Sequence, residues 1–348
     1  MGFSSVSFSR PASISGIKTP EGHFFDSLET YAGYFDACAG HGQERPTAPV
    51  WLEEVYLHVP SGILVNRNGC LLSISCPEPY NIGRSRLLGK AHPGSKVRTR
   101  HAVGSSIMHR QALKNYYHWF IDCLPRLFYY REALAGIKVM LPPRKGIFLD
   151  MLQWLCPPEV EVAFSQEKWQ YFAHFLWLPP VSADGAGKIP VGFQDYLRRC
   201  LALPEASAVS PQARWGYISR AQANRRRLLH EAVFVERCIL PFGGEVVCFE
   251  QMDFHAQMQK ASEMDFLVGL HGAGLTNLIA MAPPASVLEI RSFSRTMDHY
   301  KVLAHASGVR HFTYWVESRQ AVNEDVILTQ NDLDGLQQAI RAHLKPGR

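Results

Sequence analysis

The sequence predicts an α/β protein of two lobes, each built on a parallel sheet, with a central cleft between the lobes. A chain of 348 residues, 47% hydrophobic and 19% charged, can bury two cores. Strand and helix patterns alternate along it, most regularly after residue 213, which is typical of a parallel sheet covered on both faces. The segment 265–289 is the clearest unit: an apolar strand, a turn of small residues, a helix and a second apolar strand.

The elements of the first half follow from apolar runs between turn signals. Pro125 lies within a helical pattern, so it must occupy a first turn or kink the helix. The expected strands are 54–59, 62–65, 70–74, 137–141, 160–164 and 172–178, with Asn68-Gly69 as a hairpin signal, and the expected helices are 117–135 and 146–155.

The elements of the second half alternate more strictly. Asn331-Asp332 is a capping signal for the last helix. The expected strands are 215–219, 245–249, 266–270, 286–290 and 309–314, and the expected helices are 193–203, 229–240, 253–263, 275–282, 297–307 and 333–343.

Prolines and composition divide the chain. Residues 1–23 are rich in Ser and Gly and predict an irregular arm, and prolines cluster near residues 179–211. The expected parts are the arm 1–23, a first α/β lobe 24–189, a connecting segment 190–212, a second lobe 213–330 and a C-terminal helix 331–348.

Charge and cysteine content restrict the class of protein. A net charge of +5 without a basic tail does not favour nucleic-acid binding. No run of about 18 apolar residues and no signal-peptide pattern is present, so we expect no transmembrane helix. The eight cysteines form no Cys-x-x-Cys pair, which suits a reducing compartment. These features predict a cytoplasmic protein.

The turn His271-Gly272-Ala273-Gly274 joins a strand to a helix in the second lobe. Its glycines permit close backbone approach and positive φ, and a helix N-terminus directs unpaired N–H groups at an anion. His271 could donate to a phosphate oxygen. The turn alone leaves a phosphate site and an ordinary βα turn equally open, and it is not the Gly-x-Gly-x-x-Gly of nicotinamide enzymes.

Three further groups in this lobe suit a phosphorylated ligand. Ser219-Arg220 ends a predicted strand, and arginine binds phosphate oxygens in a bidentate manner. In the run Arg225-Arg226-Arg227 one member reaches the ligand or all three form a solvated face. Glu289 ends the strand after the turn, where a carboxylate either binds two ribose hydroxyls or makes a structural salt bridge.

In the first lobe, His118 and Asp122 are four residues apart and share one helix face. Either is a candidate general base, although an acid in a first helical turn also complements the helix dipole. Asp332-Leu333-Asp334 resembles a metal-binding DxD by letter but opens a helix, where acids serve as caps. We therefore expect no metal site.

Taken together, the motifs are similar to those of glycosyltransferase family 61. The resemblance covers about residues 100–314, and the first hundred residues carry no matching motif. It rests on Tyr116-Tyr117-His118-Trp119-x-x-Asp122-x-Leu124-Pro125-Arg126, on Tyr217-Ile218-Ser219-Arg220, and on Gly269-x-His271-Gly272-Ala273-Gly274-Leu275-Thr276-Asn277 with Glu289. Where relatives often show Asn-Glu after the arginine cluster, this chain has His230-Glu231.

The resemblance implies a GT-B architecture and an inverting, metal-independent transferase that needs no cofactor. The donor would be a nucleotide sugar, expected to be UDP-linked, and the acceptor a glycan or glycolipid. Asp122 would be the favoured base and His118 its rival. The expected binding residues are Ser219, Arg220, Arg225, His271, Gly272, Ala273, Gly274, Asn277 and Glu289.

The resemblance also implies a bacterial member that makes capsular or other surface polysaccharide at the cytoplasmic face of the membrane, with peripheral membrane association left open. The oligomeric state, the sugar and the linkage do not follow from the sequence. Two alternatives stand beside the transferase: a non-catalytic protein that binds nucleotide sugars, and a nicotinamide-dependent oxidoreductase. The presence of both His118 and Asp122 argues against the first.

Overall fold

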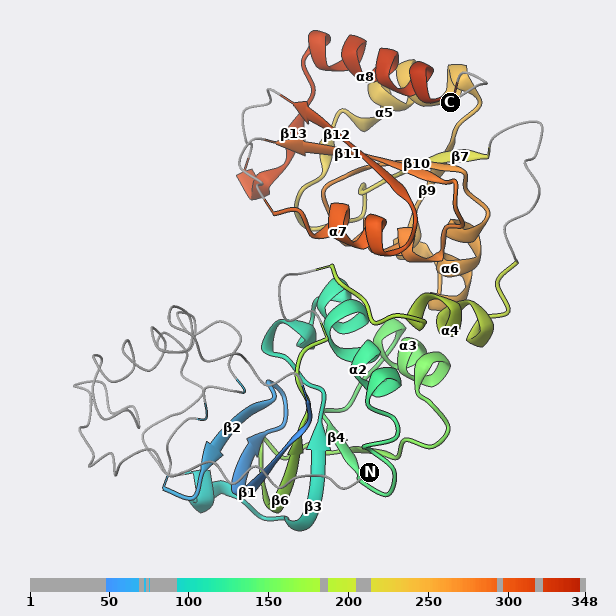
Figure 1. Ribbon diagram of the computed structural model, residues 1–348. Helices are drawn as coiled ribbons and strands as arrows, with labels where there is room; N and C mark the ends of the chain where they lie inside the picture. The colour runs from blue at the N-terminus through green and yellow to red at the C-terminus, as the bar shows by residue number, and fades with distance from the viewer. Residues whose placement is uncertain are drawn as a thin grey trace, which may run out of the picture. The chain divides into compact units, whose positions relative to one another are not determined.

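The computed structural model divides the chain into two compact units (Figure 1). Unit 1 comprises Met1–Lys145 and Cys156–Ala183, and unit 2 comprises Gly146–Leu155 and Asp184–Arg348. The structure describes residues 48–68, 72, 75, 93–181, 187–204, 214–292, 297–316 and 322–344. The expected arm 1–23 lies outside these residues, as does the expected strand 70–74 apart from Leu72.

Unit 1 contains a mixed six-stranded sheet in the order β2-β1-β6-β3-β4-β5. The β3, β4, β5 and β6 strands pair in parallel, but β1 is antiparallel to both β2 and β6. The expected parallel sheet is therefore only partly correct here, because the short link from β1 to β2 can form only a hairpin. The strands are β1 Val50–His58, β2 Ile63–Asn66, β3 Arg100–Ser106, β4 Val139–Leu141, β5 Val162–Phe164 and β6 Trp169–Trp177.

The helix expected at 117–135 is two shorter elements. A π-helical segment, His118–Cys123, is followed by α2, Leu124–Tyr129, with Pro125 in the first turn of α2. Pro125 thus lies where the hydrogen-bond pattern changes from π to α, and its missing N–H interrupts the ladder there. Two 3₁₀ helices complete the described helices of this unit, at Pro93–Lys96 and Arg110–Leu113.

Unit 2 contains a five-stranded parallel sheet in the order β12-β11-β10-β7-β9. This confirms the parallel sheet expected from the alternation of strands and helices after residue 213. A separate parallel pair joins β8, Leu228–Leu229, to β13, Val326–Ile327. The sheet strands are β7 Trp215–Ile218, β9 Glu245–Val247, β10 Phe266–Leu270, β11 Ser286–Ser292 and β12 Arg310–Val316.

Helices lie on both faces of this sheet, with α5 and α8 on one side and α6 and α7 on the other (Figure 1). Thr329 caps α8 and forms a capping box with Asp332, so the acid at the start of this helix has a capping role. Leu333, Leu336 and Ile340 of α8 join the core formed by β7, β10 and β11. The α-helices are α3 Ile147–Leu155, α4 Phe193–Cys200, α5 Glu231–Phe234, α6 Phe254–Ser262, α7 His299–Ala306 and α8 Gln330–His343.

The remaining described helices of unit 2 are short and follow other geometries. The helix expected at 229–240 is interrupted, since α5 passes into a π-helical segment after four residues. These elements are the π-helical Val235–Ile239 and the 3₁₀ helices Leu240–Phe242, Phe249–Gln251, Ala273–Ala280 and Val322–Glu324.

Two helices expected outside the second lobe belong to unit 2. The α3 helix, expected in the first lobe, accepts a hydrogen bond at Leu155 O from the hydroxyl of Tyr196 on α4, 3.3 Å away. The α4 helix, expected as part of a connecting segment, donates from Gln194 to the carbonyl of Ile279 at 2.9 Å and from Arg198 to that of Ala280 at 2.7 Å. These bonds tie α4 to the segment that follows the glycine turn.

Five cysteines lie among the described residues, Cys123, Cys156, Cys200, Cys238 and Cys248, and all are free thiols. Burial raises the pKa of the Cys123 thiol to about 12. In the part of the chain that the structure describes, no helix is both long and apolar enough to cross a membrane.

Candidate functional site

In the turn His271-Gly272-Ala273-Gly274 at the end of β10, close packing rather than positive φ explains the two glycines. Gly272 has φ 178°, which any residue adopts, and neither Gly272 nor Gly274 is left-handed. A Cβ on Gly272 would collide with Nη1 of Arg220, and one on Gly274 would lie 2.9 Å from Cγ2 of Ile218. The expectation of positive φ was wrong, whereas the expectation of close approach is confirmed: glycine lets a guanidinium pack against the turn.

The segment after this turn is a 3₁₀ helix, Ala273–Ala280, rather than the α-helix expected at 275–282. Asn277 is fully buried in it and donates from its amide to Oε1 of Gln257 on α6 at 2.9 Å. This bond makes Asn277 an anchor of the segment. Ala273 and Gly274 are partly exposed.

Arg220 lies two residues after the end of β7 and is 8% exposed. Its Nε donates to the carbonyl of Arg226 and its Nη2 to that of Arg225, each at 2.9 Å. Burial lowers the pKa of this guanidinium, and the positive charge of Arg226 lowers it further. Arg226 in turn donates from Nη1 to the carbonyl of His271, 3.4 Å away. Two guanidiniums therefore converge on the turn, an arrangement that an anionic ligand would stabilise.

The three consecutive arginines have different partners. Arg225, an expected binding residue, has a side chain 64% exposed and pairs with Glu324 at 3.0 Å, and Arg227 pairs with Asp325 at 2.9 Å. Only Arg226 contacts the turn. All three arginines pair with acids of the segment 322–326, and Arg226 also reaches the turn, so the choice between a ligand contact and a solvated face stays a prediction.

Glu231, in the first turn of α5, was not among the expected site residues. Its carboxylate accepts hydrogen bonds from the Tyr217 hydroxyl at 2.7 Å, the Ser219 hydroxyl at 2.9 Å and the backbone N–H of Arg220 at 3.3 Å. Ser219 thus faces this carboxylate, and Glu231 fixes the end of β7 from which Arg220 projects. The sequence signal was the His230-Glu231 pair, in which Glu231 keeps the acid of the Asn-Glu pattern and only His230 differs from it.

Glu289 on β11 is 1% exposed and lies between two imidazoles. One oxygen is 2.5 Å from Nδ1 of His271 and the other is 2.8 Å from Nε2 of His311. Burial alone would raise the pKa of this carboxyl, but the hydrogen bonds from the two histidines lower it to about 2. Both oxygens are therefore engaged, which favours the structural alternative for Glu289 and makes it a support for His271. His311 was not predicted as a site residue because the sequence of β12 contains no recognisable motif.

This carboxylate makes acid stability a direct test of the arrangement. A carboxyl whose pKa falls from 4.5 to about 2 on folding stabilises the protein above pH 4.5, and this contribution is lost as the pH falls from 4.5 towards 2. We expect urea denaturation to show a wild-type advantage over Glu289→Gln on the order of 3 kcal/mol at pH 6, shrinking below pH 4.5. An advantage that does not change with pH would contradict the ionised state of Glu289.

His271 also carries aromatic neighbours. Its ring lies 5.0 Å from the ring of His299 and 5.1 Å from that of Tyr300, both edge-on and both at the start of α7. Burial raises the pKa of the Tyr300 hydroxyl, which keeps it a neutral donor. Glu289 and these rings fix the orientation of the His271 imidazole.

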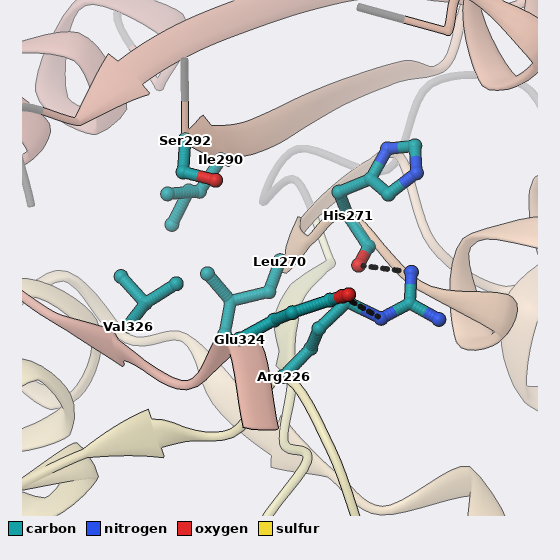
Figure 2. Close-up of a pocket in the computed structure, with 7 residues that line it drawn as sticks. All are labelled: Arg226, Leu270, His271, Ile290, Ser292, Glu324 and Val326. Atoms are coloured by element: carbon teal, nitrogen blue, oxygen red, sulfur yellow. Dashed lines mark hydrogen bonds and ion pairs between the residues drawn. The ribbon is translucent and has the colours of Figure 1, made fainter. Parts of the chain in front are cut away.

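A pocket opens beside the turn (Figure 2). Leu270 and Ile290, at the carboxyl ends of β10 and β11, line it with Val326, and Arg226 and Glu324 lie together on one side. Ligands of parallel α/β sheets bind at this end of the strands. Ser292 and His271 complete the lining.

In unit 1, His118 and Asp122 form a hydrogen-bonded pair. Nδ1 of His118 is 2.6 Å from Oδ2 of Asp122, and the side chains are 22% and 16% exposed. Both lie in the π-helical segment, a geometry that often marks functional sites. The prediction that they share one helix face is confirmed.

His109 lies next to this pair, with its ring 5.6 Å from that of His118. The three residues offer ligand atoms that all lie within 4.8 Å of one another. Such a group could hold a metal ion, which the sequence did not predict, and the 2.6 Å bond between His118 and Asp122 also permits proton transfer between them.

One family model covers both the His118–Asp122 pair and the turn with Arg220. The family model described as Glycosyltransferase 61 matches residues 116–288, which begin just before His118 and end just before Glu289. Over these residues the chain is similar to glycosyltransferase family 61. Of the residues described above, the family 61 segment contains the His118–Asp122 pair, Arg220 and the glycine turn, while Glu289, His311 and Glu324 lie beyond it.

Two rice proteins (Oryza sativa subsp. japonica) are similar to parts of the chain. Beta-1,2-xylosyltransferase XYXT1 is 25% identical over 239 residues, which cover 61% of this chain and 50% of the relative. Beta-1,2-xylosyltransferase RCN11 is 30% identical over 79 residues, which cover 23% of this chain and 15% of the relative. The chain thus spans at most about half the length of these relatives. The family 61 match and these relatives support a glycosyltransferase.

Proposed function

We propose that the protein is an inverting glycosyltransferase that moves a sugar from a UDP-linked donor to a hydroxyl of a glycan or glycolipid acceptor. The observation that carries this proposal is the Arg220 guanidinium packed against Gly272, with Arg226 beside it. Arg220 is buried and Arg226 is 31% exposed, and two like charges this close repel each other, so a further anion at the turn would stabilise them. A diphosphate at the turn supplies that anion.

The leaving group of the reaction is the nucleoside diphosphate, which gains negative charge as the bond to the sugar breaks. Arg220, Arg226 and the His271 imidazole, held through Nδ1 by Glu289, would stabilise this charge. The backbone N–H groups at the start of the 3₁₀ helix add to them. Three cationic or donor side chains are sufficient for this role, so we propose that no metal ion is required.

The proton of the acceptor hydroxyl needs a base, and we assign it to His118. Its Nδ1 is engaged by Asp122, which leaves Nε2 as the proton acceptor of the neutral imidazole. Near neutral pH an imidazole suits this task better than a carboxylate that already accepts a hydrogen bond. Asp122 then orients the ring and stabilises the imidazolium that forms. The family resemblance implied the opposite order, with Asp122 as the favoured base and His118 as its rival.

The proposed reaction is a single displacement. The acceptor oxygen attacks the anomeric carbon from the face opposite the diphosphate while His118 takes the hydroxyl proton, and the diphosphate leaves with the bonding electron pair. We propose the GT-B arrangement for the reacting complex, in which unit 1 supplies the base and unit 2 holds the donor. Exclusion of water from that complex would limit donor hydrolysis.

The donor sugar is proposed from the relatives. Both similar proteins carry the name xylosyltransferase, so UDP-xylose is the first donor to test, before UDP-hexoses. A role in bacterial surface polysaccharide synthesis at the cytoplasmic face of the membrane is a further proposal, based on the resemblance of the motifs alone.

A thermal-shift screen tests the proposed ligand class. UDP at 100 times its Kd is expected to stabilise unit 2 by about 2.7 kcal/mol, a rise of roughly 5–11 °C in Tm, with or without EDTA. NAD and inorganic sulfate at the same concentration are the controls. Stabilisation by NAD but not by UDP would contradict the proposed function, and dependence on a divalent cation would contradict the metal-free scheme.

A further inference from the structure

We propose that Glu324 is the residue that binds the ribose hydroxyls of the donor. This inference rests on the proposed function, since it takes the diphosphate at the turn as given. Glu324 is the one acid among the described residues that line the pocket beside that turn. It lies on the same side of the pocket as Arg226, as Figure 2 shows.

Glu289 was the expected ribose ligand, but its position excludes it. Its side chain is 1% exposed, and its two oxygens are taken by His271 and His311. The side chain of Glu324 is 28% exposed. A carboxylate has about four acceptor positions, so Glu324 can pair with an arginine and still accept hydrogen bonds from a pair of vicinal hydroxyls.

The backbone holds Glu324 in an unusual conformation. Asn323 and Glu324 are both left-handed, with φ 66° and 61°, and Arg226 opposite them has φ 56°. Left-handed residues other than glycine persist where neighbouring structure fixes them, and they cluster at ligand-binding segments.

Three contacts join the segment of Arg226 and Arg227 to the segment 323–326 and hold both in place. The N–H of Arg226 donates to the carbonyl of Asn323 at 3.1 Å, the N–H of Val326 donates to the carbonyl of Arg227 at 2.8 Å, and Arg227 pairs with Asp325 at 2.9 Å. The carboxylate of Glu324 is thus presented at a defined place on the pocket wall.

The charges around Glu324 would allow it to accept hydrogen bonds from the ribose when the diphosphate is bound. In the structure it pairs with Arg225 at 3.0 Å and with Arg226 at 3.7 Å. A diphosphate carries more negative charge than one carboxylate and competes for Arg226, which also contacts the turn. Glu324 then keeps Arg225 as its partner and turns its other acceptor positions to the ribose.

The pocket itself suits this assignment. Its cavity volume is about 20 Å³, enough for a hydroxyl group, and it is open to solvent on one side. Leu270, Ile290 and Val326 give it apolar walls. Hydrogen bonds from hydroxyls to a carboxylate are stronger where such walls exclude water.

The test compares UDP with 2′-deoxy-UDP by isothermal titration calorimetry, in the wild type and in Glu324→Gln. We expect the wild type to bind UDP about 10- to 100-fold more tightly than 2′-deoxy-UDP, because a hydroxyl bonded to a carboxylate is lost. We expect Glu324→Gln to reduce this preference to about threefold or less. Glu324→Asp, which shortens the side chain but keeps its charge, is expected to lose most of the preference too.

Glu245→Gln provides the matched control, because Glu245 pairs with Lys260 rather than with a residue of the pocket. It is expected to leave the preference for UDP unchanged, and circular dichroism checks that each variant is folded. Equal weakening or equal tightening of both ligands in Glu324→Gln would show that Glu324 is only a counter-ion of the arginines, and would overturn the inference. A wild type that binds UDP and 2′-deoxy-UDP equally overturns it as well, whereas a wild type that binds neither also removes the proposed function.

Discussion

Replacing His118 by Gln is expected to lower the kcat of sugar transfer by about 10²- to 10⁴-fold, the usual contribution of a positioned general base. Asp122→Asn is expected to lower kcat by a similar factor. The amide of Asn can donate as well as accept, so it no longer fixes the Nδ1–H tautomer of His118, in which Nε2 accepts the proton. The double variant should be little worse than either single one, since the two side chains act as a unit. Initial rates of UDP release measure all three.

The Kd for UDP is the control in these variants, because both residues lie in unit 1 and the proposed nucleotide site lies in unit 2. It is expected to stay within about twofold of the wild-type value. Full activity in His118→Gln combined with lost activity in Asp122→Asn would return the base role to Asp122. Full activity in both would remove the pair from the reaction.

Removing the Arg220 guanidinium is the second large change. Arg220→Ala is expected to raise the Kd for UDP by about 10- to 100-fold, because it removes a charge-assisted hydrogen bond to the diphosphate. Gly272→Ala is expected to weaken UDP binding as well, since the added Cβ displaces the same guanidinium. Isothermal titration calorimetry measures both.

Arg237→Ala is the matched control, because Arg237 pairs with Asp334 at 2.9 Å, away from the turn. It removes one positive charge from unit 2 and should leave the Kd for UDP almost unchanged. An unchanged Kd in both Arg220→Ala and Gly272→Ala would place the diphosphate elsewhere. A loss of the same size in Arg237→Ala would mean that net charge, rather than the turn, governs binding.

The fold was most predictable where sequence pattern and environment agree. In unit 2 the strands β10 and β11 are buried on both faces and read as apolar runs, so they were located almost to the residue. In unit 1 the strand β3, Arg100–Ser106, was missed because its first four residues are largely exposed and form no apolar run. The π-helical segment was read as α-helix because the two geometries have nearly the same apolar periodicity over six residues.

The candidate site was predictable by residue type more than by contact. The glycine turn, Arg220 and the His118–Asp122 pair were all selected from the sequence, and the last was placed correctly on one face. Partners across strands were not predictable, because His311 and Glu289 are brought together by strand register rather than by sequence spacing. For the same reason the run Arg225-Arg226-Arg227 did not reveal which member reaches the turn.

The central claim, an inverting transfer from a UDP-linked sugar, is tested most directly by the anomeric configuration of the first product. Donor hydrolysis, with water as the acceptor, makes this measurable by ¹H NMR spectroscopy before the free sugar mutarotates. From UDP-α-D-xylose, or from the α-linked donor that the binding screen selects, the account predicts β-configured sugar as the first signal. Release of the α-configured sugar first would contradict the single displacement.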